Sequence, residues 1–194
     1  MEENFLYYIE HSIRIHWEEP ALTDYQGQTH TFGDVAHHIA RLHLLFEESG
    51  IRRGDKIALC SRNTSSWGIA FLATLSYGAV AVPILNEFKP DNVHHIVNHS
   101  EARLLFAGDV VWENLDESAM PDLDGVLRIE DYSLRTSNSK RSQSQIKRTV
   151  RKKIPRSFPC RRCSLRIRYA RPAGRDQLYL GHYQFFQRSD AALP

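Results

Sequence analysis

Cysteine is scarce in this 194-residue sequence, and the N-terminus lacks the features of an export signal. The chain has only Cys60, Cys160 and Cys163, which provide no paired disulfide framework and suit a reducing cytoplasm. Its first five residues, 1–5, are acidic and apolar and lack the basic start of a secretory signal peptide. These shortages argue against a disulfide-stabilised secreted protein and favour a cytoplasmic one.

The sequence also has no long apolar run that reads as a membrane span. Residues 67–85 are uncharged and long enough to cross a bilayer, but polar residues, Gly78 and Pro83 interrupt them. This run predicts a helix, a glycine stop and a buried strand instead. We therefore expect no transmembrane segment.

Acidic residues are missing from one part of the chain. Residues 1–133 hold 21 Asp and Glu against 9 Lys and Arg, whereas residues 134–194 hold 16 Lys and Arg against two acidic residues. No acidic residue lies between Asp131 and Asp176. The net charge of +2 therefore averages an acidic segment and a basic one, which indicates two regions of different character.

The acidic region has the pattern of an α/β domain with a largely parallel sheet and flanking helices. Apolar residues at helical spacing alternate with short apolar strands, a succession typical of such domains. Thr31 and Asp34 have the spacing of a helix capping box, and Gly50 and Gly78 are predicted to end helices. We expect helices over 5–16, 31–49, 66–77, 91–99 and 110–117, and strands over 21–25, 28–31, 56–60, 79–85, 103–107 and 126–129. The strand over 79–85 is predicted to be buried on both faces.

This alternation stops after Asp131. Residues 133–145 are polar, and no segment from Leu134 to Arg175 has a convincing apolar period. We place a boundary at residues 131–135. Residues 1–131 are predicted to form the folded domain, and residues 132–194 a disordered basic tail.

Four short motifs give the first region a resemblance to a known family. They are Thr31-Phe32-Gly33-Asp34-Val35, then 54–59 with the following Trp67, then Gly78 to Ile84, and finally Asn98-His99-Ser100-Glu101-Ala102. Each is weak alone, but together and in order they resemble the opening part of AMP-forming acyl-CoA synthetases, most of all the long-chain fatty acid–CoA ligase branch. The resemblance implies the N-terminal part of that family's large domain.

The resemblance also implies a reaction and its cofactors. Such enzymes use ATP, Mg²⁺ and CoA to join a fatty acid to CoA through an acyl-adenylate. The phosphates are held by a loop that reads approximately Thr-Ser-Gly-Thr-Thr-Gly-x-Pro-Lys-Gly, which is absent from this sequence. The matching motifs are scaffold, so no residue is nominated as catalytic, cofactor-binding or metal-binding. We expect the chain to be a truncated fragment that is inactive alone.

A reading-frame slip near codons 132–136 accounts for the tail. Read one base later, the codons of Tyr179 to Gln184 permit Thr-Ser-Gly-Thr-Thr-Ser, and those of Phe185 to Asp190 permit Phe-Ser-Lys-Gly-Val-Met. Together these strings resemble the missing phosphate loop. The same shift allows Cys160-Arg161-Arg162-Cys163 to become Val-Glu-Asp-Val, which replaces surplus arginines by acids. We therefore interpret residues 132–194 as out-of-frame translation.

Two alternatives remain open at this point. A basic tail can bind nucleic acid or another polyanion through its lysines and arginines, with Tyr169 available for stacking. Residues 1–133 can instead act as a stand-alone interaction module, although uncovered sheet edges favour self-association or aggregation. The tail's basic residues are Lys147, Arg148, Arg151, Lys152, Lys153, Arg161, Arg162, Arg166, Arg168 and Arg171.

Several metal-ligand types occur without a complete site. Cys160 and Cys163 have the spacing of half a zinc site, but only His182 follows them as a further ligand. His95 and His99 are four residues apart on one expected helix, a spacing that can bind a metal, beside His94. We interpret all three as a solvated helix face. His37, His38 and His43 are interpreted as polar helix positions, and Asp116, Glu117, Asp122 and Asp124 as surface loop.

Overall fold

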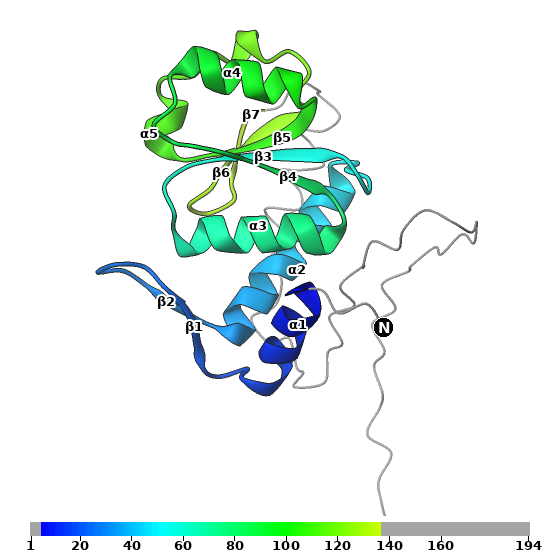
Figure 1. The fold of residues 1–194 in the computed structure, drawn as a ribbon, viewed down its shortest axis with the longest axis vertical. Coiled ribbons are helices and arrows are strands. Elements are labelled where there is room, and N and C mark those ends of the chain that lie inside the picture. The colour runs from blue at the N-terminus through cyan, green and yellow to red at the C-terminus, as the bar shows by residue number, and fades with distance from the viewer. Residues whose placement is uncertain (1–4, 137–194) are drawn as a thin grey trace, which may run out of the picture.

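The computed structural model describes residues 5–136, which form one α/β domain built on a five-stranded sheet. The strands lie in the order β4-β3-β5-β6-β7, with helices α2 and α3 on one face and α4 on the other (Figure 1). A separate hairpin, β1-β2, packs beside α2. The helices are α1 Phe5–Ile15, α2 Phe32–Glu48, α3 Ser65–Tyr77, α4 Pro90–His99 and α5 Asp109–Trp112, with a 3₁₀ turn, η1, over Glu117–Ala119. The strands are β1 Pro20–Thr23, β2 Thr29–Thr31, β3 Lys56–Cys60, β4 Val80–Ile84, β5 Ala102–Ala107, β6 Gly125–Arg128 and β7 Leu134–Thr136.

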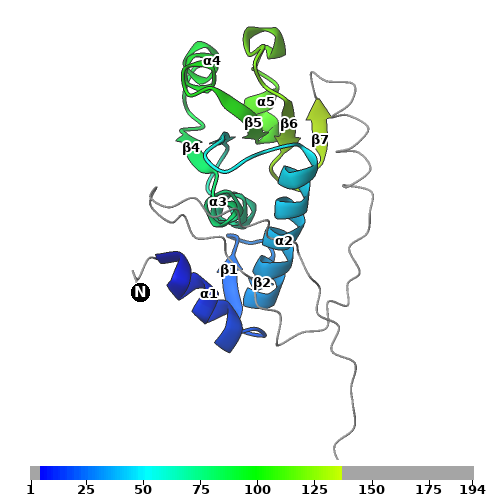
Figure 2. The same ribbon diagram turned by 90° about the vertical axis from the view of Figure 1, so that its right-hand side faces the viewer.

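The sheet confirms the predicted fold class. Strands β4, β3, β5 and β6 are mutually parallel, and only β7 runs antiparallel, against β6. Parallel strands need helical crossovers, and α3 and α4 supply two of them. Figure 2 shows α3 nearly end-on beside the long α2.

Strand β3 lies at the centre of the core because its side chains pack into the hydrophobic clusters on both faces of the sheet. Ile57 and Leu59 pack with α2 and α3, whereas Ala58 and Cys60 pack with α4. All four side chains are fully buried. A parallel strand covered on both faces requires such a continuous apolar run.

Helix α2 begins and ends as the sequence predicts. The backbone N–H of Asp34 donates to Thr31 Oγ1 (3.1 Å), and the backbone N–H of Thr31 donates to Asp34 Oδ2 (2.9 Å). These two hydrogen bonds form the expected capping box. At the other end, Gly50 adopts φ 72°, and the N–H of Ile51 donates to the carbonyl of Phe46 (2.9 Å). That arrangement turns the chain back onto the helix.

Two predictions about burial are wrong. Strand β4 forms the edge of the sheet and is not buried on both faces, since Val80 and Pro83 are exposed and only Ile84 is fully buried. His43 is not a polar surface position. It is buried, and its Nε2 lies 3.0 Å from Ser76 Oγ and 3.1 Å from the carbonyl oxygen of Ala73. These contacts reach across to α3 and make His43 part of the α2–α3 interface.

Some element limits also differ from the sequence prediction. Helix α4 begins with Pro90 after an N-cap at Lys89 that makes no side-chain cap bond, so Asp91 lies inside the first turn. The expected helix over 110–117 is replaced by the short α5 and η1. Strand β7 extends the sheet past the predicted domain limit at residue 131. The carboxylate of Asp124, which the sequence places in a surface loop, pairs with Arg103.

A group of aromatic and imidazole rings joins α2 to β2 and to the turn between β6 and β7, and it leads to a pH prediction. The ring of His38 lies 5.5 Å from that of His30 and 5.8 Å from that of Tyr132, measured between centroids. Burial, with the neighbouring His30 and Arg41, lowers the pKa of His38, and the carboxylate of Asp34 opposes this only in part. Neutral His38 is thus the form that the fold favours.

We therefore expect the free energy of unfolding to fall as the pH drops below about 6.5, the ordinary pKa of histidine in the unfolded chain. Below this pH, His38 takes up a proton more readily in the unfolded chain than in the folded one. The contribution of neutral His38 to stability is therefore fully present above this pH and is lost as the pH falls. His38→Gln should flatten the pH dependence of urea unfolding between pH 7.5 and 5.5, whereas His11→Gln, an exposed control, should not. An equally steep profile in His38→Gln would contradict this assignment.

Candidate binding site

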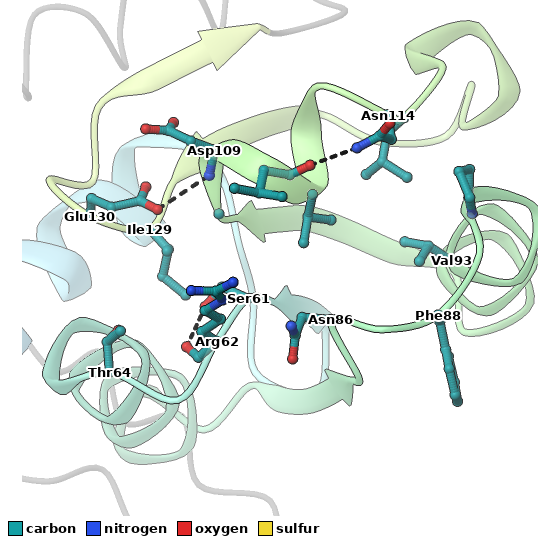
Figure 3. Close-up of a pocket in the computed structure, with 15 residues that line it drawn as sticks. Ser61, Arg62, Thr64, Asn86, Phe88, Val93, Asp109, Asn114, Ile129 and Glu130 are labelled. Atoms are coloured by element: carbon teal, nitrogen blue, oxygen red, sulfur yellow. Dashed lines mark hydrogen bonds between the residues drawn. The ribbon is translucent and has the colours of Figure 1, made fainter. Parts of the chain in front are cut away.

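A pocket of about 430 Å³ lies where the parallel strands end. The residues that follow β3, β4 and β5, and those at the end of β6, surround it (Figure 3). The carboxyl edge of an open α/β sheet is the usual place for a ligand, because loops from neighbouring strands converge there. The lining residues are Ser61, Arg62, Thr64, Asn86, Phe88, Pro90, Val93, Gly108, Asp109, Val110, Val111, Asn114, Leu115, Ile129 and Glu130.

One side of the pocket is polar and carries a positive charge. Ser61 Oγ donates a hydrogen bond to the backbone carbonyl of Arg62 (2.9 Å), which fixes the turn after β3. Figure 3 shows the Arg62 side chain extending into the pocket from this turn. Among the described residues, its guanidinium group forms no ion pair. Arg62 is therefore available to a polar or anionic ligand.

The acidic side chains of the pocket are already paired. The Nε of Arg128 donates to Asp109 Oδ1 (3.0 Å), and Arg128 also lies 3.4 Å from Glu130 Oε2. Arg135 of β7 pairs with Asp109 as well. The backbone N–H of Asp109 donates to Glu130 Oε1 (3.2 Å), which joins the start of α5 to the end of β6. This network holds the pocket wall and largely neutralises its carboxylates.

Gly108 lets the ends of β3 and β5 approach closely. Its N–H donates to the carbonyl of Cys60 (3.1 Å), and a Cβ atom at this position would lie 3.0 Å from the Cβ of Ser61. Any larger residue would push the Ser61 turn outward and change the pocket. Val93, Val111 and Leu115 provide an apolar wall on the α4 side.

The start of α3, next to the pocket, does not form a phosphate cradle. Thr64 Oγ1 accepts from the N–H of Trp67 (3.2 Å), and Asp24 Oδ1 accepts from the N–H of Ser65 (2.7 Å). Both backbone donors are thus used within the protein, and Asp24 adds negative charge. A triphosphate needs free N–H groups at such a terminus.

Cys60, at the end of β3 next to the pocket-lining Ser61, is not an activated nucleophile. Burial, followed by the charge of Glu87, raises the pKa of Cys60 to about 11, so its thiol stays protonated at neutral pH. Among the described residues no group of three or more His, Cys, Asp or Glu could hold a metal ion. The start of α3, whose N–H donors are used and which has Asp24 beside it, does not fit the triphosphate of ATP.

The polar residues noted in the sequence lie in different places. His95 and His99 stack on α4, whereas His94 Nε2 accepts a hydrogen bond from the N–H of Asp116 (3.1 Å). Residues Cys160, Cys163, His182 and the basic residues of 147–171 lie outside the described residues. Sequence reasoning missed Arg62, Asn86 and Asp109 as pocket residues. The available signal was their common position, two residues after the end of a strand.

Comparison with known proteins identifies the class to which this α/β domain belongs. The AMP-binding enzyme family matches residues 9–173. Among relatives, the medium-chain fatty-acid–CoA ligase of Escherichia coli (strain K12) is 23% identical over 143 residues, which are 70% of this chain and 25% of the ligase. A long-chain-fatty-acid–CoA ligase of Mycobacterium bovis is 32% identical over 77 residues, which are 40% of this chain and 13% of that ligase.

A solved structure confirms the fold. The crystal structure of an anthranilate CoA ligase in complex with anthranoyl-AMP matches with a TM-score of 0.63 at 20% identity, covering 75% of this chain and 27% of that one. The chain spans about a quarter or less of the two curated relatives. It belongs to the AMP-binding enzyme family.

The motifs that carried the resemblance occupy structural positions. Thr31 and Asp34 cap α2, and Gly78 ends α3 with φ 89°. Gly54, at φ 85°, precedes β3 and donates its N–H to the carbonyl of Gly78 (2.9 Å).

In the part of the chain that the structure describes, no helix is long and apolar enough to span a membrane.

The Asp109–Arg128–Arg135 network predicts a measurable contribution to stability. Asp109→Asn keeps the side-chain shape but removes the charge that both arginines contact, so we expect unfolding free energy to fall by about 1–2 kcal/mol. Glu113 is exposed and forms no ion pair within residues 5–136, so Glu113→Gln should change the unfolding free energy by less than about 0.5 kcal/mol. Equal effects in urea titrations would show that the network adds nothing.

Proposed function

We propose that this domain is the N-terminal part of the large domain of an ATP-dependent long-chain fatty acid–CoA ligase in the cytoplasm. Support comes from family membership, from the similarity to two fatty-acid–CoA ligases, and from the motifs at the starts of α2 and β4. The family match over residues 9–173 is the observation that carries the proposal. It does not favour the alternative of a polyanion-binding module.

The proposed reaction has two steps. A carboxylate oxygen of the fatty acid attacks the α-phosphorus of ATP, and pyrophosphate leaves, which gives the acyl-adenylate. The sulfur of the CoA thiolate then attacks the acyl carbon, forms the thioester and releases AMP. Developing negative charge on phosphate must be stabilised by donors and cations held close by. We assign none of these roles to a residue of this chain.

We further propose that the 194-residue chain does not catalyse adenylation by itself. The Gly/Ser/Thr-rich phosphate loop with its lysine is absent from the sequence, and residues 134–194 carry 16 Lys and Arg against two acids. A one-base shift in the reading frame permits that loop from the codons of 179–190. Out-of-frame translation after about residue 132 would account for both observations with one cause, but the family match runs on to residue 173 and so does not itself support a frame change at that point.

The purified 194-residue chain should therefore show no ATP–pyrophosphate exchange in the presence of fatty acid. The reason is physical, because without a cradle the triphosphate is neither oriented nor neutralised. Radiolabelled pyrophosphate incorporation into ATP measures this directly. Exchange above a heat-inactivated control, dependent on both fatty acid and Mg²⁺, would refute the proposed inactivity.

Restoring the shifted frame should restore activity. The gene is first sequenced around codons 130–194 and beyond. One base is then inserted or removed near codon 132 to restore the frame. ATP–pyrophosphate exchange by the full restored protein is measured with palmitate, octanoate, benzoate and a mixture of amino acids. We expect exchange to be highest with palmitate. A control with the restored loop lysine changed to alanine should lose at least about a hundredfold in rate.

The outcomes separate the parts of the proposal. Absence of the phosphate loop from the shifted frame would refute the frame interpretation. Exchange with benzoate or amino acids but not with palmitate would refute the long-chain substrate while leaving adenylation intact.

A further inference from the structure

The outer face of α4 carries a pair of histidines that the pocket and the proposed reaction do not use. We propose that His95 and His99 form a two-imidazole site for a late first-row divalent metal ion such as Ni²⁺, Cu²⁺ or Zn²⁺. This proposal does not depend on the proposed ligase function. It rests on the geometry of the pair, the freedom of its ring nitrogens and the local charge.

The geometry of the pair suits a chelate. Residues four apart on a helix lie one above the other on the same face. The rings of His95 and His99 lie 5.7 Å apart between centroids, with an angle of 8° between their planes. Both residues are exposed, so a hydrated ion can reach them without a change in the fold. Two histidines at this spacing on a helix are an established way to hold zinc.

The ring nitrogens of the pair are uncommitted among the described residues. Neither side chain takes part in a hydrogen bond or ion pair there, and their only ring contact is with each other. His94 differs, because its Nε2 accepts the N–H of Asp116 across to the next element. One helix therefore holds two available imidazoles and one that is occupied.

Local charge also favours a cation. His99 is the last residue of α4, where the carbonyl ends of the helix dipoles give a partial negative charge. The first 133 residues carry 21 acidic side chains against 9 basic ones. A divalent ion at His99 therefore meets a favourable potential.

The donor set defines the class of ion. Neutral imidazole suits Ni²⁺, Cu²⁺ and Zn²⁺ and is a poor ligand for Mg²⁺ or Ca²⁺, which require oxygen. Because no group of three or more potential ligands exists within residues 5–136, water must complete the coordination. We expect an exposed site of moderate affinity with one ion per chain.

Nickel titration of the full 194-residue chain tests the site. All variants carry Cys160→Ser and Cys163→Ser, because those thiols could bind metal themselves. Isothermal titration with NiCl₂ at about pH 7.5, where imidazoles are mostly neutral, should give one ion per chain. His95→Ala and His99→Ala should each weaken binding by at least about tenfold. His94→Ala is the matched control and should bind as the parent does.

Moving the pair gives a sharper test. Residues 91 and 95 are also four apart on α4, so Asp91→His combined with His99→Ala rebuilds the spacing one turn earlier. We expect this double variant to recover most of the affinity that His99→Ala loses. Circular dichroism should show that all variants retain the parent's helix content and thermal transition.

Three results would overturn the proposal. They are unchanged nickel affinity in both His95→Ala and His99→Ala, an equal loss in His94→Ala, and half an ion per chain with nickel-dependent dimers in sedimentation. The last result would assign the ion to a contact between two copies rather than to one helix. None of them bears on ligase activity, which the frame-restored protein tests separately.

Discussion

The central strand β3 is the constraint on which the rest of the domain depends. It lies between β4 and β5, and its side chains from Ile57 to Cys60 are fully buried in two different clusters. A shift of one residue would exchange the clusters that receive Leu59 and Cys60, so packing fixes its register. Helices α2 and α3 must then cover one face and α4 the other.

That same register brings the pocket together. The turns after β3, β4 and β5 begin at matching heights because the strands are parallel and paired residue by residue, Cys60 with Ile84 and with Ala107. Polar residues that follow these strand ends therefore meet at one edge. Gly108 allows the turns to touch, and Arg128 ties α5 to β6. The pocket is a consequence of strand order more than of any single motif.

Local patterns predicted what depends on local forces. The capping box at Thr31 and the glycine stops at Gly50 and Gly78 involve neighbours within a few residues, and all three are confirmed. The burial of His43 could not be predicted in this way, because its partner Ser76 lies 33 positions away.

Features set by pairing across the sheet were also beyond local patterns. Strand β7 has little apolar content and exists through its pairing with β6. The edge position of β4 follows from strand order, which its apolar sequence does not encode.

Strand β4 is an edge of the sheet that no further strand covers within residues 5–136. Val80, Leu85 and Phe88 are exposed at or just beyond β4, yet Pro83 offers no N–H for a further strand to use. A partner strand would therefore pair imperfectly along this edge, whereas the exposed apolar side chains still favour contact. The predicted self-association of the chain should accordingly be driven by apolar surface, and should weaken on cooling as hydrophobic association does.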